Sequence, residues 1–191
     1  AMMLSFFSLL LKFLPKKLIS YLFGLAANTL WPSWILQPFL RKFVSWYSIP
    51  MEDYAEPLES FTTFNQFFIR KLRPSLRPLA ADPQSIVSPV DGTISVFGSL
   101  EKDQLLQAKG VTYSVDALLG NSQKADLYKN GSYMTIYLAP HNYHRIHSMV
   151  TGEVTEVTYC AGDLWPVNSI GLQVPGLFTL NERVVTHLQT D

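Results

Sequence analysis

The sequence has a single cysteine, Cys160, so no internal disulfide can stabilise the fold. We expect Cys160 to be a small, buried apolar side chain. Internal repeats and low-complexity tracts are also missing, and 191 residues suffice for one domain with an appendage and a sizeable core. Nucleic acid is not favoured as a partner, because no cluster of basic residues with interleaved polar side chains recurs along the chain.

Acidic residues are absent from positions 1–50, which hold five of the 15 basic residues. This first quarter therefore carries a formal charge of +5, and the rest of the chain carries −5. A basic and strongly apolar end followed by a mildly acidic body predicts one part that faces a membrane and one that faces water.

Residues 18–40 form an uncharged stretch, yet they make a poor membrane-spanning helix. The 23 residues are long enough to cross about 30 Å of hydrocarbon, but Pro32 and Pro38 should break or sharply kink a helix. A cleaved signal peptide also fits poorly, because Lys12, Lys16 and Lys17 follow the first apolar block instead of preceding it.

Short helices lying in the membrane interface fit this region better. Each large apolar side chain that enters lipid contributes about 1.5–3 kcal/mol, and each basic residue near anionic headgroups about 1 kcal/mol. We expect residues 1–60 to be a helical membrane-binding region and linker, at the cytoplasmic face of the cell membrane as a peripheral protein. A helical subdomain packed on its own protein is the alternative. The side chains expected to enter lipid are Phe6, Phe7, Leu10, Leu11, Phe13 and Leu14, and those expected to meet headgroups are Lys12, Lys16 and Lys17.

Local patterns predict an α+β fold, with N-terminal helices followed by a mainly antiparallel, β-rich body over residues 61–191. Helices are expected at 3–14, 16–30 and 33–47, and a short one should begin at Thr62 or Thr63 and end before Pro74. Residues 72–78 should be extended. Strands are expected at 132–138, 152–159 and 183–188, with a short helix at 114–119. Segments 85–88 and 93–97 flank Asp91-Gly92, which predicts a hairpin.

Histidines and one aspartate are the candidates for chemistry. His144 and His147 are three positions apart and would share a face if their segment were helical. Histidine is the side chain whose ordinary pKa lies near neutrality, so this pair and a carboxylate such as Asp91 can form an acid–base centre. A purely structural role for each of these residues is the alternative.

His141 extends the spacing to three histidines, so a metal-dependent hydrolase is a further alternative. Three ligands from one short helix would splay around its axis, and no carboxylate follows at ligand spacing. Arg145, between the histidines, could hold a carboxylate or phosphate through two hydrogen bonds, or could form a structural ion pair.

Five motifs together resemble phosphatidylserine decarboxylase proenzymes, in the same order and over nearly the whole chain. The N-terminal apolar helices are also similar to the membrane-binding segment of that family. The motifs are Phe64-Asn65-Gln66-Phe67-Phe68-Ile69-Arg70-Lys71-Leu72-Arg73-Pro74, Pro89-Val90-Asp91-Gly92, Tyr143-His144-Arg145-Ile146-His147, Gly162-Asp163-Leu164 with Val167-Asn168, and Asn181-Glu182-Arg183.

The resemblance implies that Asp91 and His147 act with a serine in self-cleavage, and that His144 serves decarboxylation. That serine becomes a covalent pyruvoyl group, which draws the electrons released with carbon dioxide as phosphatidylserine is converted to phosphatidylethanolamine. The implied partners are phosphatidylserine, an anionic membrane surface and the C-terminal (alpha) chain of the same proenzyme, and a homodimer is possible. No metal is implied.

A Leu-Gly-Ser-Thr cleavage site is missing from this sequence. Leu118-Leu119-Gly120-Asn121-Ser122 is only superficially similar, and it precedes the histidines, where the family's site does not lie. We therefore expect the chain to be the N-terminal portion of the large (beta) chain, truncated at its C-terminus, with the pyruvoyl serine beyond Asp191. Such a fragment should be inactive alone. A non-catalytic protein that binds anionic lipid is the remaining alternative.

Overall fold

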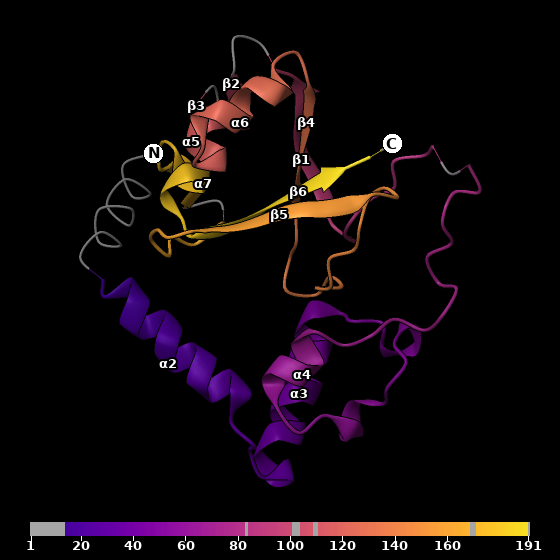
Figure 1. Cartoon of the computed structure of the whole chain (residues 1–191). Helices are drawn as coiled ribbons and strands as arrows, with labels where there is room; N and C mark the ends of the chain where they lie inside the picture. Colours follow the sequence, from indigo (N-terminus) through magenta and orange to yellow (C-terminus); the bar gives the residue numbers. More distant parts are fainter. Residues whose placement is uncertain (1–13, 83, 101–103, 109–110, 169–170, 191) are drawn as a thin grey trace.

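The computed structural model describes residues 14–82, 84–100, 104–108, 111–168 and 171–190. Nearly all of the helix expected at 3–14 lies outside these residues. The described chain has an α+β fold whose strands pair only antiparallel, as the sequence predicts. Figure 1 shows helices α3 and α4 grouped away from the strands, with α2 running between the two parts along one side.

The N-terminal helices are α2 (Lys16–Asn28) and α3 (Ser33–Tyr47), which confirms the helices expected at 16–30 and 33–47. Pro38 lies inside α3, so the helix is not broken at this proline. Two 3-10 turns, η1 (Met51–Asp53) and η2 (Leu58–Ser60), follow in the predicted linker. Among the described residues, no helix is both long enough and apolar enough to cross a membrane.

Helix α4 (Phe64–Phe68) is the short helix expected from the sequence, and its cap explains where it begins. The Thr63 hydroxyl accepts a hydrogen bond from the Gln66 backbone N–H at 3.1 Å. The Gln66 side chain in turn accepts one from the Thr62 backbone N–H at 3.1 Å, so two terminal groups are satisfied reciprocally.

The strands form three two-stranded sheets in the described part of the chain. Strand β1 (Thr93–Ser99) pairs with β4 (Ser132–Tyr137), β2 (Gln104–Ala108) with β3 (Val111–Ser114), and β5 (Glu153–Cys160) with β6 (Arg183–Gln189). Short helices lie between them: α5 (Val115–Leu119), α6 (Ser122–Ala125), η3 (Asp126–Tyr128), η4 (Gly171–Gln173) and α7 (Leu177–Leu180). The β2–β3 hairpin was not expected from the sequence.

Cys160 is half-buried, with Sγ 3.8 Å from the Leu119 carbonyl oxygen.

Two local expectations are wrong. The segment 85–88 is not a strand, and β1 pairs with β4, so Asp91-Gly92 does not join a hairpin. Residues 72–78 are not extended throughout, because the chain turns at Pro74 and Ser75, and Ser75 has a left-handed backbone with φ of 70°.

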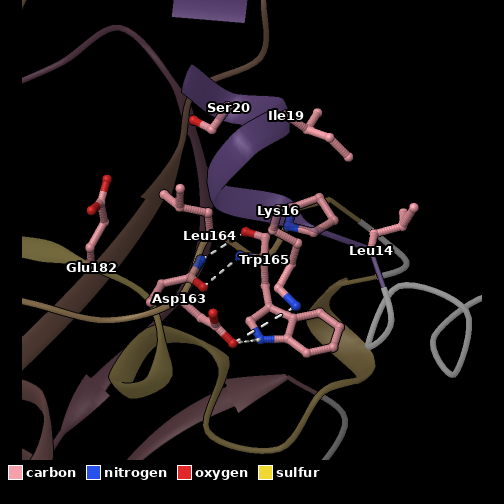
Figure 2. Close-up of a pocket in the computed structure, with 10 residues that line it drawn as sticks. Leu14, Lys16, Ile19, Ser20, Asp163, Leu164, Trp165 and Glu182 are labelled. Atoms are coloured by element: carbon pink, nitrogen blue, oxygen red, sulfur yellow. Dashed lines mark hydrogen bonds and ion pairs between the residues drawn. The ribbon is translucent and has the colours of Figure 1, made fainter. Parts of the chain in front are cut away.

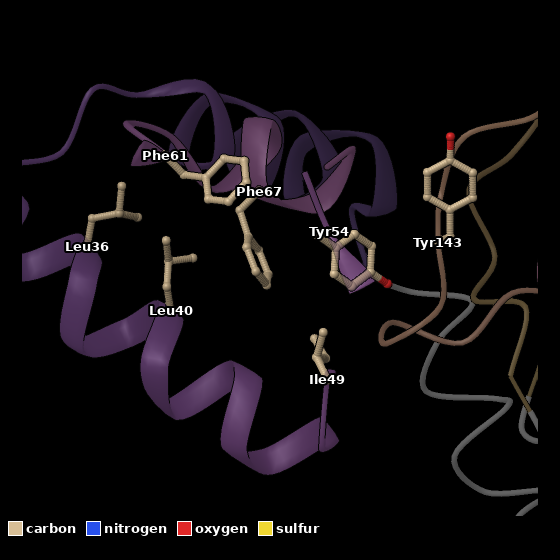
Figure 3. Close-up of a cluster of buried hydrophobic side chains, with 7 residues drawn as sticks. All are labelled: Leu36, Leu40, Ile49, Tyr54, Phe61, Phe67 and Tyr143. Carbon is tan, nitrogen blue, oxygen red and sulfur yellow. The ribbon is translucent and has the colours of Figure 1, made fainter. Parts of the chain in front are cut away.

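A hydrophobic cluster joins the helical part to the histidine segment (Figure 3). Tyr143 lies at its edge and comes from a loop more than seventy residues after α4. The cluster contains residues from both sides of position 60, and the division into domains at 60 and 61 stays a prediction. Its buried members are Leu36, Leu40, Ile49, Tyr54, Phe61, Phe67 and Tyr143.

Candidate active site

The segment that carries the histidines is a loop between β4 and β5 and not a helix. His144 and His147 therefore do not share a helical face. Two backbone hydrogen bonds join the end of this loop to the segment before Asp91. His147 N–H donates to the Pro89 carbonyl at 2.9 Å, and Val87 N–H donates to the Met149 carbonyl at 2.9 Å. These bonds bring the Asp-Gly motif and the second histidine together.

Asp91 and His147 line one pocket of about 480 Å³. Its other walls come from residues 72–79, from 87–90 and from Tyr143 and Ser148. In the part of the chain that the structure describes, the hydrogen bonds of Asp91 go to Arg77 and the ring bond of His147 goes to Tyr143. The carboxylate and the imidazole therefore line the same pocket, and within the described chain each is hydrogen-bonded to a different neighbour.

Tyr143 holds the His147 ring in place. Its hydroxyl lies 2.9 Å from His147 Nε2, and the two rings are stacked with centroids 5.6 Å apart. Burial raises the pKa of the Tyr143 phenol, so the hydroxyl stays neutral at physiological pH. A hydroxyl arriving from another segment would therefore have to replace or share this bond to reach Nε2.

Arg77 is the ion-pair partner of Asp91. Its Nη2 lies 2.6 Å and its Nε 2.8 Å from the same carboxylate oxygen, Oδ2. The hydrogen bond to Asp91 raises the pKa of Arg77 above its ordinary value. The guanidinium thus places a positive charge in the wall of the pocket.

His144 lies elsewhere. Its ring stacks on Phe68 of α4, with centroids 4.0 Å apart, and its Nε2 lies 2.9 Å from the Ala139 carbonyl oxygen. Because a carbonyl can only accept, this nitrogen carries a hydrogen. Burial is the main cause that lowers the pKa of His144, so the ring is neutral near pH 7. His144 is not among the residues that line the pocket of Asp91 and His147.

The three histidines make separate contacts. The His141 ring lies 6.4 Å from the ring of Tyr47, while His144 contacts Phe68 and His147 contacts Tyr143. Within the described ranges, no group of three or more His, Cys, Asp or Glu side chains is placed to hold a metal ion. This geometry does not favour a hydrolase with His141, His144 and His147 as ligands.

Arg70 fixes the histidine loop to α4. This side chain is 1% exposed, and its Nη2 donates to the His141 carbonyl at 2.9 Å and to the Tyr54 hydroxyl at 3.0 Å. Its guanidinium also lies over the Tyr54 ring, 4.2 Å from the centroid. Burial lowers the pKa of Arg70 from its ordinary value, but not enough to remove the charge of a guanidinium near neutrality.

Arg145 strengthens the same junction. Its Nε donates to the Ile69 carbonyl at the end of α4, at 2.8 Å. The motif at 64–74 and the histidine motif are therefore one structural unit, although about seventy residues separate them in the sequence.

The two remaining motifs also meet. Asp163 and Asn181 form a parallel bridge, and the Asn181 side chain bonds the Trp165 backbone in both directions at 2.8 Å. A second pocket is lined by residues of both motifs and of α2, and Figure 2 shows Lys16 of α2 beside Trp165 in it. Its Nζ lies 4.2 Å from the centroid of the Trp165 ring and 3.9 Å from Asp163, and the side chain is only 12% exposed. Lys16 therefore docks α2 on the β-rich part, whereas the sequence led us to expect contact with lipid headgroups.

Sequence reasoning missed Arg77, Tyr143 and Arg70 as parts of the site. Tyr143 and Arg70 belong to motifs quoted above, so their position offered a signal. Arg77 offered none, because an isolated arginine before Pro78 is typical of any polar loop.

The fold and the pocket define a class of protein: an α+β protein in which a carboxylate and an imidazole line one pocket. A sequence model of the family described as "Phosphatidylserine decarboxylase" matches residues 64–191. The chain belongs to the phosphatidylserine decarboxylase family.

Three relatives illustrate the similarity, and each is called "Phosphatidylserine decarboxylase proenzyme". The chain is 42% identical to that of Myxococcus xanthus over 96% of its own length and 66% of the relative. It is 44% identical to that of Klebsiella pneumoniae over 93% of its length and 56% of the relative. It is 42% identical to that of Escherichia coli O139:H28 over 99% of its length and 60% of the relative. The chain thus spans less than two thirds of each relative.

Proposed function

We propose that this chain is the N-terminal part of a phosphatidylserine decarboxylase proenzyme, a carboxy-lyase that converts phosphatidylserine to phosphatidylethanolamine. Membership of the family and the names of the relatives support this assignment. The observation that carries it is the common pocket of Asp91 and His147, with room beside the ring for a further segment.

Self-cleavage needs a serine hydroxyl, which is a weak nucleophile until a base takes its proton. In this proposal the serine lies beyond Asp191 and enters the pocket. His147 takes the hydroxyl proton as the serine oxygen bonds to the carbonyl carbon of the residue before it, and returns a proton to the serine nitrogen as the peptide C–N bond breaks and an ester forms. The ester oxygen then leaves by elimination with the proton of the serine α-carbon, which cuts the chain, and the remaining dehydroalanine takes up water and releases ammonia to give the pyruvoyl group. Asp91 orients the imidazole and stabilises its positive charge, the part that a carboxylate plays in catalytic triads.

The pyruvoyl group made from that serine would supply an electron sink for decarboxylation. The pocket fits such a group in size, since its volume of about 480 Å³ exceeds that of a few side chains. The substrate loses its carboxylate as carbon dioxide and takes up one proton at the same carbon. We assign delivery of that proton to His144: Nε2 already donates its hydrogen to the Ala139 carbonyl, so Nδ1 would first take up a proton from solvent and then pass it to the substrate carbon.

The sheets of this chain expose an apolar surface that the second chain of the proenzyme can cover. A two-stranded sheet alone is only marginally stable in water, and the sheets here expose large apolar side chains. Phe97 of β1 is 70% exposed, Val157 of β5 is 61% exposed and Val184 of β6 is 63% exposed. We assign these faces to the C-terminal chain, and expect the 191-residue chain alone to release no carbon dioxide.

The helical part suits a membrane surface. No residue of α2 is fully buried, and the exposed fractions of Phe23, Trp34 and Trp46 are 73%, 75% and 77%. An apolar pocket of about 520 Å³ lies between α2, α3 and Phe64. The proposed location is the cytoplasmic face of the cell membrane, with phosphatidylserine drawn from the same surface.

The test uses the full-length proenzyme on a denaturing gel. Asp91→Asn and His147→Ala should leave it uncut, because the first removes the orienting charge and the second removes the base. Asp126→Asn and His141→Ala are matched controls outside the pocket and should be cut normally. Normal cutting of Asp91→Asn or of His147→Ala would contradict the proposed site.

A further inference from the structure

Arg77 is the closest charged neighbour of the proposed cleavage carboxylate, yet it lies outside every motif that led to the site. Both of its contacts, from Nη2 at 2.6 Å and from Nε at 2.8 Å, fall on Oδ2 of Asp91. Its third nitrogen, Nη1, donates to the Leu76 carbonyl at 3.1 Å, which fixes the guanidinium plane to its own backbone. In the described chain, Oδ1 of Asp91 is thus left for another donor.

The backbone delivers Arg77 to this place by a specific route. The chain leaves α4, turns at Pro74 and Ser75, and returns along the pocket as the wall formed by residues 72–79. Ser75 has φ of 70°, a left-handed conformation that a serine adopts at some cost. Leu76 N–H donates to the Arg73 carbonyl and closes the turn. The turn therefore places the Arg77 side chain in contact with Asp91 in the wall of the pocket.

We propose that Arg77 is a positioning residue for self-cleavage: it holds the Asp91 carboxylate in one orientation, so that Oδ1 can accept the His147 ring N–H. This inference depends on the role of Asp91 in the proposed function. The Asp91 side chain is 29% exposed, so without a partner it could rotate among several conformers. Charge-assisted hydrogen bonds from a planar guanidinium restrict it to one.

An ordinary surface ion pair is the competing interpretation. The Arg77 side chain is 51% exposed, and pairs of this kind contribute little to stability. The two interpretations differ in what the loss of Arg77 changes. Loss of a simple surface pair changes neither folding nor cleavage to any great extent. Loss of a positioning residue leaves folding intact and slows cleavage.

The experiment follows self-cleavage of the full-length proenzyme over time on a denaturing gel. Arg77→Ala should cleave about 10–100-fold more slowly, the range expected when a reacting group is misplaced by about an ångström. Its thermal midpoint should remain that of the wild type. Arg77→Lys should recover part of the rate, because it restores the charge but not the two donors. Added methylguanidinium should also partly rescue Arg77→Ala, a result that a purely structural role cannot give.

Lys129→Ala is the matched control, since the Lys129 side chain is 52% exposed and pairs with Asp126 outside the pocket. It should cleave at the wild-type rate. Cleavage of Arg77→Ala at that rate would overturn the inference. A slow Arg77→Ala that melts early and is not rescued by methylguanidinium would overturn it too. Asp91→Asn, run in parallel, separates the two claims: if it cleaves normally, the proposed function itself fails.

Discussion

At the scale of single residues, the two histidines of one motif have different surroundings. His147 lines an open pocket beside Tyr143, whereas His144 is packed on Phe68 and bonded to the Ala139 carbonyl. Burial penalises the charged form of His144 and lowers its pKa, and the nearby charge of Arg70 acts in the same direction. Three residues of separation thus produce one ring that lines a pocket and one that is packed against an aromatic ring, where burial favours its neutral form.

The lowered pKa of His144 predicts a dependence of stability on pH. In the unfolded chain its pKa is about 6.5, and in the folded chain it is lower, so the unfolded state binds the proton more readily. The stabilising contribution is fully present above about pH 6.5 and is lost as the pH falls through the folded pKa. Urea denaturation of the 191-residue chain should show a free energy of unfolding that decreases in this window.

His144→Gln should remove that part of the pH dependence, because glutamine does not titrate. His141→Gln is the matched control from the same loop and should keep it. An unchanged pH dependence in His144→Gln would show that the His144 ring is not held neutral.

The residue types suggested Asp91 and the two histidines as a possible acid–base centre, and the family resemblance singled out Asp91 and His147 as partners. Their residue types alone also allowed a turn aspartate and a structural histidine. The sequence could not identify Arg77 or the contact of Lys16 with Trp165, because both depend on segments that only the tertiary fold brings together. Side chains that act across a pocket leave no periodic pattern in the chain.

At the scale of elements, Gly92 shows why the predicted hairpin was wrong. Asp-Gly is a strong turn signal when glycine supplies a positive φ, but Gly92 is not among the described residues with positive φ. The glycine is needed for close approach instead. A Cβ at this position would lie 2.6 Å from the Tyr137 carbonyl oxygen and 2.7 Å from Ile136 Cγ2, where β1 begins to pair with β4.

Gly92→Ala should therefore destabilise the chain by about 1–3 kcal/mol, because the added methyl must push β4 away. Gly24→Ala is the matched control: nothing lies within 4 Å of its Cβ, and it is inside helix α2. That substitution should stabilise by about 0.5–1 kcal/mol, since alanine favours a helix. Urea denaturation measures both, and equal effects of the two substitutions would contradict the close-approach argument.

Helices were easier to predict than strand pairing. The boundaries of α2, α3 and α4 follow from prolines and a threonine cap that act locally. The partner of β1 lies about forty residues further along the chain, after the β2–β3 pair, the helices α5 and α6 and the 3-10 turn η3. Local alternation marks a strand but does not identify its neighbour, so β4, β5 and β6 were predicted as strands without their pairing.

At the scale of the whole molecule, the uneven charge of the sequence corresponds to two different apolar surfaces. Exposed aromatic side chains cover α2 and α3, where the chain is basic, and exposed β-strand side chains lie on the acidic part. We assign the first surface to lipid and the second to the C-terminal chain. The two assignments predict that substitutions on the first surface weaken binding to vesicles, whereas substitutions on the second destabilise the full-length protein.

Removing Phe23 and Trp34 together should weaken binding of the full-length proenzyme to vesicles that contain phosphatidylserine. Each side chain contributes about 1.5–3 kcal/mol when it enters lipid, so Phe23→Ser with Trp34→Ser should reduce the vesicle partition coefficient at least about tenfold. Phe97→Ser with Val157→Ser should leave that coefficient unchanged.

The second pair should instead destabilise the full-length protein in urea, because there the C-terminal chain covers both side chains. In the 191-residue chain, where they are 70% and 61% exposed, the same pair should change stability little. If Phe97→Ser with Val157→Ser destabilised the full-length protein and the 191-residue chain equally, the assignment of the sheet faces to the C-terminal chain would be wrong. If Phe23→Ser with Trp34→Ser left vesicle binding unchanged, the assignment of the helical surface to lipid would be wrong.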